Sequence, residues 1–268
     1  MTITPKTLDL LPQYRNGAVI RPGAIKGKGG NPHSYLINGE KYARVTTALG
    51  ILAKPALEGW AKRLTLDKVR EVLMDPDVQG ELERLATEGN HHELYEGWVD
   101  RMIATAKHAS DQARDDAADR GTNIHQEIAH VLADPPWCFG EDYPPTVYWA
   151  LTWLREAGIT VARTEMTVWD DTTMVAGTFD GAGWERDGSL VVWDWKTGGG
   201  PYFEHALQLG VYARMLEHMT GQVVQSAYIV KLMDDHYSEH RVERLTESAQ
   251  MYDAARQLHH ASKEEWWE

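Results

Sequence analysis

The sequence predicts a mixed α/β protein with a helical N-terminal half and a C-terminal half in which helices flank a central mixed β-sheet. From Thr46 to about His130, apolar residues recur with the period of a helix. After residue 159, stretches rich in Val, Thr and Trp alternate with turn-forming residues, as in consecutive strands. The 268 residues, 43% hydrophobic and 25% charged, have the composition of a folded globular protein.

The N-terminal half is predicted in two parts. Residues 1–33 are interpreted as an arm or loop, because residues 21–33, RPGAIKGKGGNPH, are basic and rich in Gly and Pro. Residues 34–110 are expected to be mostly helical, after an initial strand-turn-strand in SYLINGEKYARV. Within this region Pro55 and Pro76 are expected to interrupt the helices.

The second half, residues 111–268, is expected to hold the sheet. The proline-rich segment 134–145 predicts a loop that precedes a helix over about 146–157. Three antiparallel strands are then expected in TVARTEMTVWD, TMVAGTFDGAGWE and SLVVWDWKT, with turns at Asp170-Asp171 and Asp187-Gly188. A helix over about 203–219, strands over 222–232 and 238–245, and a helix over 246–262 complete the prediction.

Composition excludes several classes of protein. The sequence contains neither a run of about 20 apolar residues, which a membrane span needs, nor the pattern of a secretory signal at its start, so a cytoplasmic location is expected. Cys138 is the only cysteine, which excludes a disulfide framework and any four-cysteine zinc or iron–sulfur site within one chain.

The net charge of −13 argues against a broad nucleic-acid-binding surface. A nucleic-acid enzyme would therefore need local basic clusters. The candidates are Lys26 with Lys28, Lys62 with Arg63, and Arg214, and the alternative is that these are ordinary solvated charges.

Asp180, Asp194 and Lys196 form the constellation that carries chemistry. The alternation of a strand places Asp194 and Lys196 on one face and Trp195 on the other. A hairpin turn at Asp187-Gly188 would put Asp180 almost opposite Asp194, with Cβ atoms about 5 Å apart. Facing carboxylates repel unless a cation bridges them or one is protonated, and oxygen ligands suit Mg²⁺ or Mn²⁺. Taken alone, an ion pair at a strand end is the alternative.

Five short motifs in order resemble the PD-(D/E)XK nucleases, specifically the RecB-like exonuclease branch, which includes phage recombination exonucleases and CRISPR-associated relatives. They are Gly121-Thr122-Asn123-Ile124-His125, Glu165, Gly177-Thr178-Phe179-Asp180, Asp194-Trp195-Lys196-Thr197 and Gln208-Leu209-Gly210-Val211-Tyr212. The segment YLINGEKYARVTTALG also resembles the start of actinobacteriophage exonucleases. The resemblance implies a restriction-endonuclease-like core over residues 111–268 and a deoxyribonuclease, with phage-type exonuclease action in recombination or replication.

The resemblance also implies roles for single residues. Asp180 and Asp194 would bind the metal, with the Trp195 carbonyl and His125 as further ligands, and Lys196 would orient or deprotonate the attacking water. Glu165 is either another metal-site carboxylate or a strand-surface acid. Gln208 and Tyr212, one helical turn apart, either face the nucleic acid or the catalytic lysine, or belong to an ordinary helix face. Cofactors would be Mg²⁺ or Mn²⁺ without an iron–sulfur cluster.

The expected partners are linear DNA ends, a single-strand annealing or replication protein and, as an open possibility, further copies of the chain. If the chain is phage-encoded, its location is the host cytoplasm. A catalytically silent nuclease fold that binds nucleic acid or protein is the alternative, as is an unrelated acidic interaction protein. Trp149, Trp153, Trp193 and Trp195 are expected to pack in the core, with base stacking as the alternative.

Overall fold

The computed structural model describes residues 21–26, 32–52, 55–87, 91–133 and 143–264. Contacts divide the chain into two compact units, one comprising Met1–Leu52 and Asn123–Glu268 and the other Ala53–Thr122. The first unit thus includes residues 34–52, ahead of the helical segment. Lys28, Cys138 and most of the predicted loop over 134–145 lie outside the described residues.

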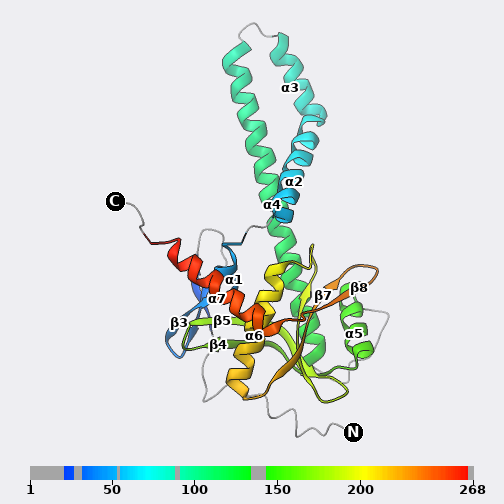
Figure 1. Cartoon of the computed structure of the whole chain (residues 1–268). Helices are drawn as coiled ribbons and strands as arrows, with labels where there is room; N and C mark the ends of the chain where they lie inside the picture. Colours follow the sequence, from blue (N-terminus) through cyan, green and yellow to red (C-terminus); the bar gives the residue numbers. More distant parts are fainter. Residues whose placement is uncertain (1–20, 27–31, 53–54, 88–90, 134–142, 265–268) are drawn as a thin grey trace. The chain divides into compact units, whose positions relative to one another are not determined.

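The second unit is helical. It contains α2 (Pro55–Leu73), α3 (Pro76–Thr87) and most of α4 (His91–Ala133), which are shown in Figure 1. Both predicted proline interruptions mark helix starts, because proline lacks the N–H that a first-turn residue leaves unpaired. Asp75 accepts hydrogen bonds from the Asp77 and Val78 N–H groups at 2.8 and 3.4 Å, which caps α3.

The first unit is a restriction-endonuclease-like α/β fold built on an eight-stranded mixed sheet. Its path is β1-β2-β3-β5-β6-β7-β8, with β4 paired to β5. The strands are β1 (Arg21–Lys26), β2 (Pro32–Ile37), β3 (Glu40–Arg44), β4 (Thr160–Asp170), β5 (Val175–Trp184), β6 (Leu190–Lys196), β7 (Val224–Leu232) and β8 (Tyr237–Arg241). The helices are α1 (Val45–Leu49), α5 (Pro145–Ala157), α6 (Phe203–Thr220), α7 (Leu245–Ala261) and the last turns of α4.

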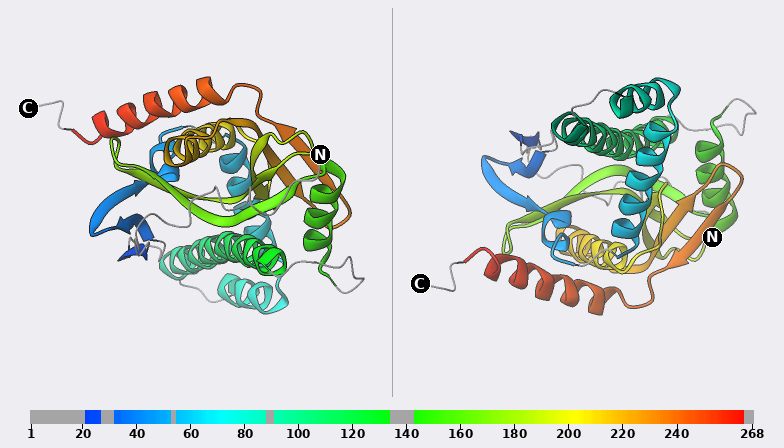
Figure 2. Two further views of the ribbon diagram at one scale, coloured as in Figure 1. Left: turned by 90° about the horizontal axis from the view of Figure 1, so that it is seen from below. Right: turned by 90° about the horizontal axis from the view of Figure 1, so that it is seen from above.

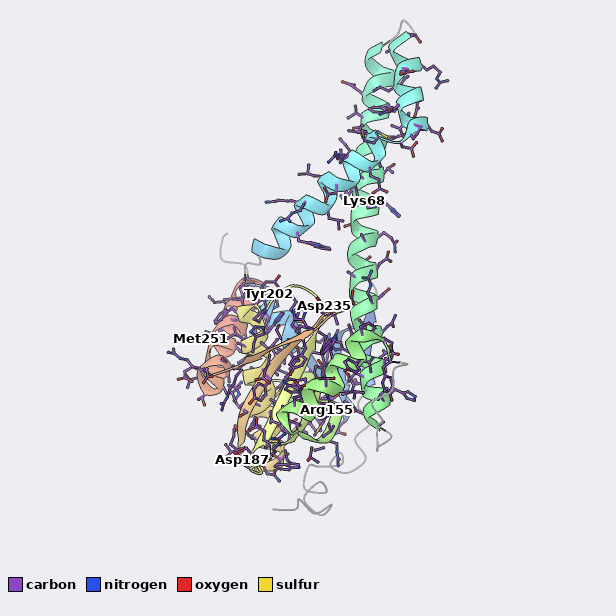
Figure 3. The ribbon with its side chains drawn as sticks, turned by 90° about the vertical axis from the view of Figure 1, so that its right-hand side faces the viewer. Lys68, Arg155, Asp187, Tyr202, Asp235 and Met251 are labelled. Atoms are coloured by element: carbon purple, nitrogen blue, oxygen red, sulfur yellow. The ribbon has the colours of Figure 1, made fainter. Side chains whose placement is uncertain are left out.

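The predicted antiparallel order of β4, β5 and β6 is confirmed. The turn before β6 lies where expected, with Gly188 at φ +89°, a conformation that favours glycine. At the other end of β6 the chain leads to Tyr202, and Figure 3 shows Asp187 and Tyr202 toward opposite ends of this unit. β7 then pairs parallel to β6.

One prediction for the N-terminal segment was wrong. Residues 21–26 form β1 and Pro32 begins β2, although the Gly and Pro content predicted a loop throughout 21–33. β1 pairs antiparallel with β2, and the register shifts between Gly23 and Lys26. This pairing satisfies backbone groups that local composition alone would leave to water.

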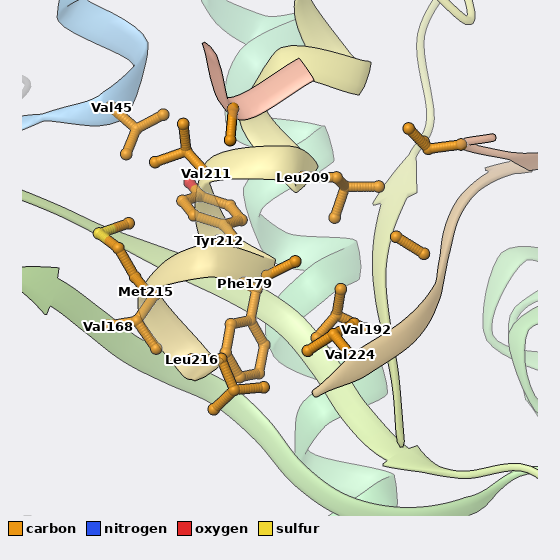
Figure 4. Packing of buried hydrophobic residues seen from close by; sticks show 14 of the residues in the cluster. Val45, Val168, Phe179, Val192, Leu209, Val211, Tyr212, Met215, Leu216 and Val224 are labelled. Atoms are coloured by element: carbon orange, nitrogen blue, oxygen red, sulfur yellow. The ribbon is translucent and has the colours of Figure 1, made fainter. Parts of the chain in front are cut away.

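Each face of the sheet carries its own hydrophobic cluster. On one face α6 packs beneath α7 and α1, and Figures 2 and 4 show this packing, with Phe179 and Val192 from the sheet against Tyr212 and Leu216 of α6. On the other face Ile128 of α4 and residues of α5 pack against β6 and β7. Among the residues described, no helix has both the length and the apolar character needed to span a membrane.

Candidate metal centre

β5 changes partners along one edge, and this change creates the site. Val175 and Ala176 mark the pairing of β5 with β3, whereas pairing with β6 begins at Gly181 opposite Trp193. The described pairs leave residues 177–180 unpaired on this edge. Continuing the β5–β6 register by one position sets Asp180 opposite Asp194, where the two strands separate.

Asp180 is held from two sides. Its Oδ1 lies 2.9 Å from His125 Nδ1 on α4, and its Oδ2 accepts a hydrogen bond from the Trp195 N–H at 2.6 Å. The side chain is buried, with 7% of the residue exposed. Trp195 therefore contributes a backbone donor that fixes a carboxylate, while the role of its carbonyl as a metal ligand stays a prediction.

Asp194 and Lys196 lie beside this pair. The Lys196 ammonium contacts Asp194 Oδ2, and Asp194 is buried with 4% exposure. Trp195, between them in sequence, packs the other way against Trp153 and Trp193, with ring centroids 5.3 and 6.0 Å apart. The alternation expected for this strand thus separates the charged groups from the tryptophan core.

Glu165 reaches the site from β4. The β4–β5 register pairs Thr164 with Gly181 and Met166 with Phe179, so Glu165 falls opposite Asp180. Its φ of +48° is a left-handed conformation that non-glycine residues rarely adopt. Such strain tends to concentrate at functional sites, where the surrounding structure enforces it. One ligand atom each from His125, Glu165 and Asp180 lies within 4.8 Å of the others.

The pKa values show that the carboxylates crowd one another. Burial, reinforced by Asp180, raises the pKa of Glu165 to about 7. Burial and Asp180 also raise the pKa of Asp194 to about 6, although Lys196 opposes the shift. Burial would lower the pKa of His125, but the Asp180 carboxylate outweighs it and raises this pKa. A cation among these groups would relieve the repulsion.

The residues present fit a divalent metal ion. Acids whose pKa values are raised by burial, and further by a neighbouring carboxylate, are a poor arrangement for a purely structural ion-pair network. The donor set combines carboxylate oxygens with one imidazole nitrogen, and the oxygens favour hard cations such as Mg²⁺ and Mn²⁺. His125, Glu165 and Asp180 would hold the ion, and the role of Asp194 as a further ligand stays a prediction.

Gln208 and Tyr212 take different positions. Gln208 Nε2 donates to the Tyr212 hydroxyl at 2.8 Å, but Tyr212 is only 3% exposed and belongs to the core under α6. A Cβ atom on Gly177 would lie 2.3 Å from Tyr212 Cε1, so the glycine makes room for this ring. Because Tyr212 is buried, it belongs to an ordinary packed helix face, which was the alternative interpretation. Its side chain is not accessible for direct contact with nucleic acid.

The remaining candidates lie outside this centre. Arg214 is not a free cation, since its guanidinium donates to both Asp253 carboxylate oxygens at 2.6 and 2.9 Å. Lys62 and Arg63 are exposed on α2 in the helical unit. Trp153, Trp193 and Trp195 are buried, which confirms core packing for these three, and Trp149 is partly buried against the same cluster.

Sequence reasoning missed the conformation of Glu165 and the spatial reason for Gly177. The Glu165 φ could not be anticipated, because glutamate has no preference for the left-handed region. Gly177 carried a signal, as a glycine inside a strand often marks a close approach of another group. What approaches it, the Tyr212 ring, becomes apparent only in three dimensions.

The family model for the PD-(D/E)XK nuclease superfamily matches residues 78–267. No curated protein sequence matches significantly. Among solved structures, the crystal structure of SSO0001 is similar at 13% identity and a TM-score of 0.34, covering 76% of this chain and 86% of that one. The match over most of its length shows that the chain belongs to the PD-(D/E)XK nuclease superfamily.

Proposed function

We propose that this nuclease is a Mg²⁺- or Mn²⁺-dependent deoxyribonuclease of the RecB-like branch, a phage-type exonuclease that hydrolyses phosphodiester bonds during recombination or replication. The observation that carries the proposal is the convergence of His125, Glu165 and Asp180 within 4.8 Å, beside the Asp194–Lys196 pair. The family membership supports nuclease chemistry, and the donor set supports a hard divalent cation.

Each acidic residue of the site has its own proposed role. Asp180 is pre-oriented by the His125 ring and the Trp195 N–H, so its carboxylate needs little rearrangement to act as a ligand. When bound, a divalent cation polarises the phosphate and supplies hydroxide near neutral pH. Glu165, whose backbone has the left-handed conformation, would add a second carboxylate ligand near His125 and Asp180, and Asp194 would add negative charge beside them.

Lys196 is proposed to orient water and phosphate at the reacting position. Burial would lower its pKa, but Asp194 and Asp180 outweigh this and raise it. The ammonium form therefore prevails at neutral pH, which favours donation of hydrogen bonds over removal of a proton. Gln208 is proposed to assist at the rim, because its amide is partly exposed while it holds the buried Tyr212 hydroxyl.

A cleavage assay tests the proposal. End-labelled linear DNA, closed circular DNA and RNA of the same sequence are incubated with Mg²⁺ or Mn²⁺, with and without EDTA. The variants are Asp194→Asn, which keeps the shape of the buried side chain, and Asp235→Asn, a matched control at an exposed loop position. Metal-dependent loss of linear DNA that Asp194→Asn abolishes and Asp235→Asn retains is expected.

The other outcomes are equally informative. Nicking of the circle at a rate similar to that of linear DNA would contradict exonuclease action while leaving the nuclease intact. Cleavage that prefers RNA would replace the substrate class. DNA binding without cleavage would support the catalytically silent binding module in place of the enzyme, and neither binding nor cleavage would overturn the proposal.

We extend the proposal to the cellular setting through the same resemblance. The protein would act in the cytoplasm of the host cell on linear DNA ends, with a single-strand annealing or replication protein as partner. Homo-oligomer formation is testable by light scattering with and without DNA, since a ring-forming enzyme would show a mass several times 30.3 kDa.

A further inference from the structure

A cavity of about 410 Å³ lies in the first unit. Its walls come from the start of the sheet, from α1 and from the C-terminal half of α7, and they include Met174 and Val175 at the start of β5. Six of the lining residues carry basic side chains, namely Lys41, Arg44, Arg256, His259, His260 and Lys263.

The charge of this cavity opposes that of the whole chain. None of the described residues that line it is acidic, although the sequence has 40 acidic against 27 Lys and Arg residues. Asp253 lies on the same helix as Arg256, but its carboxylate accepts hydrogen bonds from the Arg214 guanidinium at 2.6 and 2.9 Å. Asp253 is therefore neutralised by Arg214 and does not offset the positive charge of the cavity. The cavity therefore concentrates positive charge on an acidic protein.

Two donors at the cavity are buried without a partner. Tyr252 is 1% exposed, and its hydroxyl has no hydrogen-bond partner in the part of the chain that the structure describes. The Nε of Arg256 is buried and lacks a partner among the same residues. A buried polar group without a partner loses its hydrogen bonds to water, so such groups usually meet a ligand or an ordered water.

The pKa of His259 reflects the basic side chains around it. Burial, followed by Lys263 and then His260, lowers the pKa of His259 below its ordinary value. The second and third causes are electrostatic contributions of neighbouring basic side chains. The region thus disfavours a further cation and would favour an anion.

We propose that this cavity is a phosphate-binding site, separate from the acidic metal centre. A guanidinium, two ammonium groups and a phenol hydroxyl offer several donors to one tetrahedral anion, as phosphate recognition requires. Arg44 already lies over the Tyr35 ring, 5.6 Å from its centroid, which orients a second guanidinium at the same wall.

The position of the cavity favours a phosphate of the nucleic acid as its occupant. Five positions along β5 separate Val175 from Asp180, which corresponds to about 17 Å of strand. A nucleic-acid strand bound at the metal centre extends over that distance within a few nucleotides, so one of its phosphates is the proposed occupant. The nucleic-acid source rests on the proposed function, whereas phosphate binding itself does not.

The test measures binding in EDTA, so that it does not depend on cleavage. Fluorescent DNA is titrated against wild type, Arg256→Gln, Lys263→Gln and Tyr252→Phe, with Arg155→Gln on α5 as a control for loss of one exposed charge. Each cavity variant is expected to weaken binding about threefold to tenfold, and each charge removal to lower the slope of log affinity against log salt by about 1. Arg155→Gln is expected to change neither quantity beyond about twofold.

Inorganic pyrophosphate provides the second arm. It is expected to raise the melting temperature of wild type and Arg155→Gln but not that of Arg256→Gln or Lys263→Gln. Pyrophosphate binding with unchanged DNA affinity would support the phosphate site and assign it to a small phosphate compound. Equal responses of the cavity variants and the control in both arms would overturn it. Lys263 is exposed at the end of α7, so its variant keeps the test valid if Arg256→Gln misfolds.

Loss of the metal centre and loss of the cavity are distinguishable. Failure of cleavage in every variant, with the binding differences intact, would count against the nuclease proposal alone. Intact cleavage by wild type together with identical binding of cavity and control variants would count against the phosphate site alone.

Discussion

The middle and the start of β5 carry opposite charges. Around Asp180, burial and the neighbouring carboxylate raise the pKa values of Glu165 and Asp194 to about 7 and about 6. Around Val175, basic side chains line a cavity without an acid among its described walls. The net charge of −13 is therefore not representative of either region, because acidic and basic side chains gather at different positions along one strand.

The largest expected effect comes from Lys196→Gln at the acidic end. It should lower the rate of DNA cleavage by roughly 10²–10³-fold, the range for loss of one positioned hydrogen-bond donor at a charged transition state, while metal binding persists because no ligand is lost. Lys231→Gln, the residue opposite Lys196 on β7, is the matched control and should stay within about tenfold of wild type. Comparable rates for the two variants would remove Lys196 from the chemistry.

The next largest effect is expected in the pH dependence of metal binding at the acidic cluster. Glu165 and Asp194 must lose protons to bind a cation, and their raised pKa values place that loss near pH 7 and pH 6. Mn²⁺ affinity measured by calorimetry should be at least about tenfold weaker at pH 5.5 than at pH 8. An affinity that is flat across this range would contradict the raised pKa values.

Glu165 and Asp194 also determine how the stability of the metal-free protein changes with pH. Both carboxyls bind protons more tightly in the folded than in the unfolded chain, so their contribution is complete below about pH 4 and is lost as pH rises through 6 to 7. The melting temperature of the metal-free protein should thus fall over this range. Added Mn²⁺ should raise it more at pH 8 than at pH 5.5.

Gly177→Ala probes the strand between the two regions and should cost about 1–3 kcal/mol of unfolding free energy, a typical penalty for overpacking. The new methyl group would lie 2.3 Å from Tyr212 Cε1. The Tyr212 ring is packed in the hydrophobic core, so it has little room to move away. Urea denaturation measures the loss. Gly188→Ala is no suitable control because of its positive φ, whereas Gly59→Ala in α2 meets no neighbour and should be neutral or stabilising.

The smallest expected effect is that of Thr178→Val. Its hydroxyl lies 3.1 Å from the Tyr35 hydroxyl and 3.0 Å from that of Thr167. Removing it should destabilise the protein by about 1 kcal/mol, since two partly buried hydroxyls lose a partner. Urea denaturation should show this loss with cleavage and phosphate binding unchanged, and a change in either activity would show that the two ends of β5 are coupled.

Much of this arrangement follows from local sequence. Asp187-Gly188 fixes a short turn, and that turn sets Asp180 opposite Asp194. Valine-rich alternation places Lys196 on the side of Asp194 and Trp195 on the side of the tryptophan core. These features depend on residues close in sequence, where strand periodicity and turn chemistry act directly.

Other features depend on residues far apart in sequence. Ala43 pairs with Val175 across more than 130 positions, so residues 34–52 lie in the unit that holds the sheet. The basic cavity joins Lys41 to Lys263, whereas the expected basic clusters were read from neighbours in the chain. Charge patterning along a sequence cannot show such a cluster, because only the pairing of strands and helices brings it together.

Mn²⁺ titration of wild type beside Asp180→Asn tests the central claim most directly. The account predicts specific binding by wild type and a loss of at least about tenfold in affinity in the variant, whose amide keeps the shape of the carboxylate but not its charge. Circular dichroism confirms that both proteins are folded. Equal Mn²⁺ affinity of the two proteins would show that the cluster at Asp180 is not a metal centre.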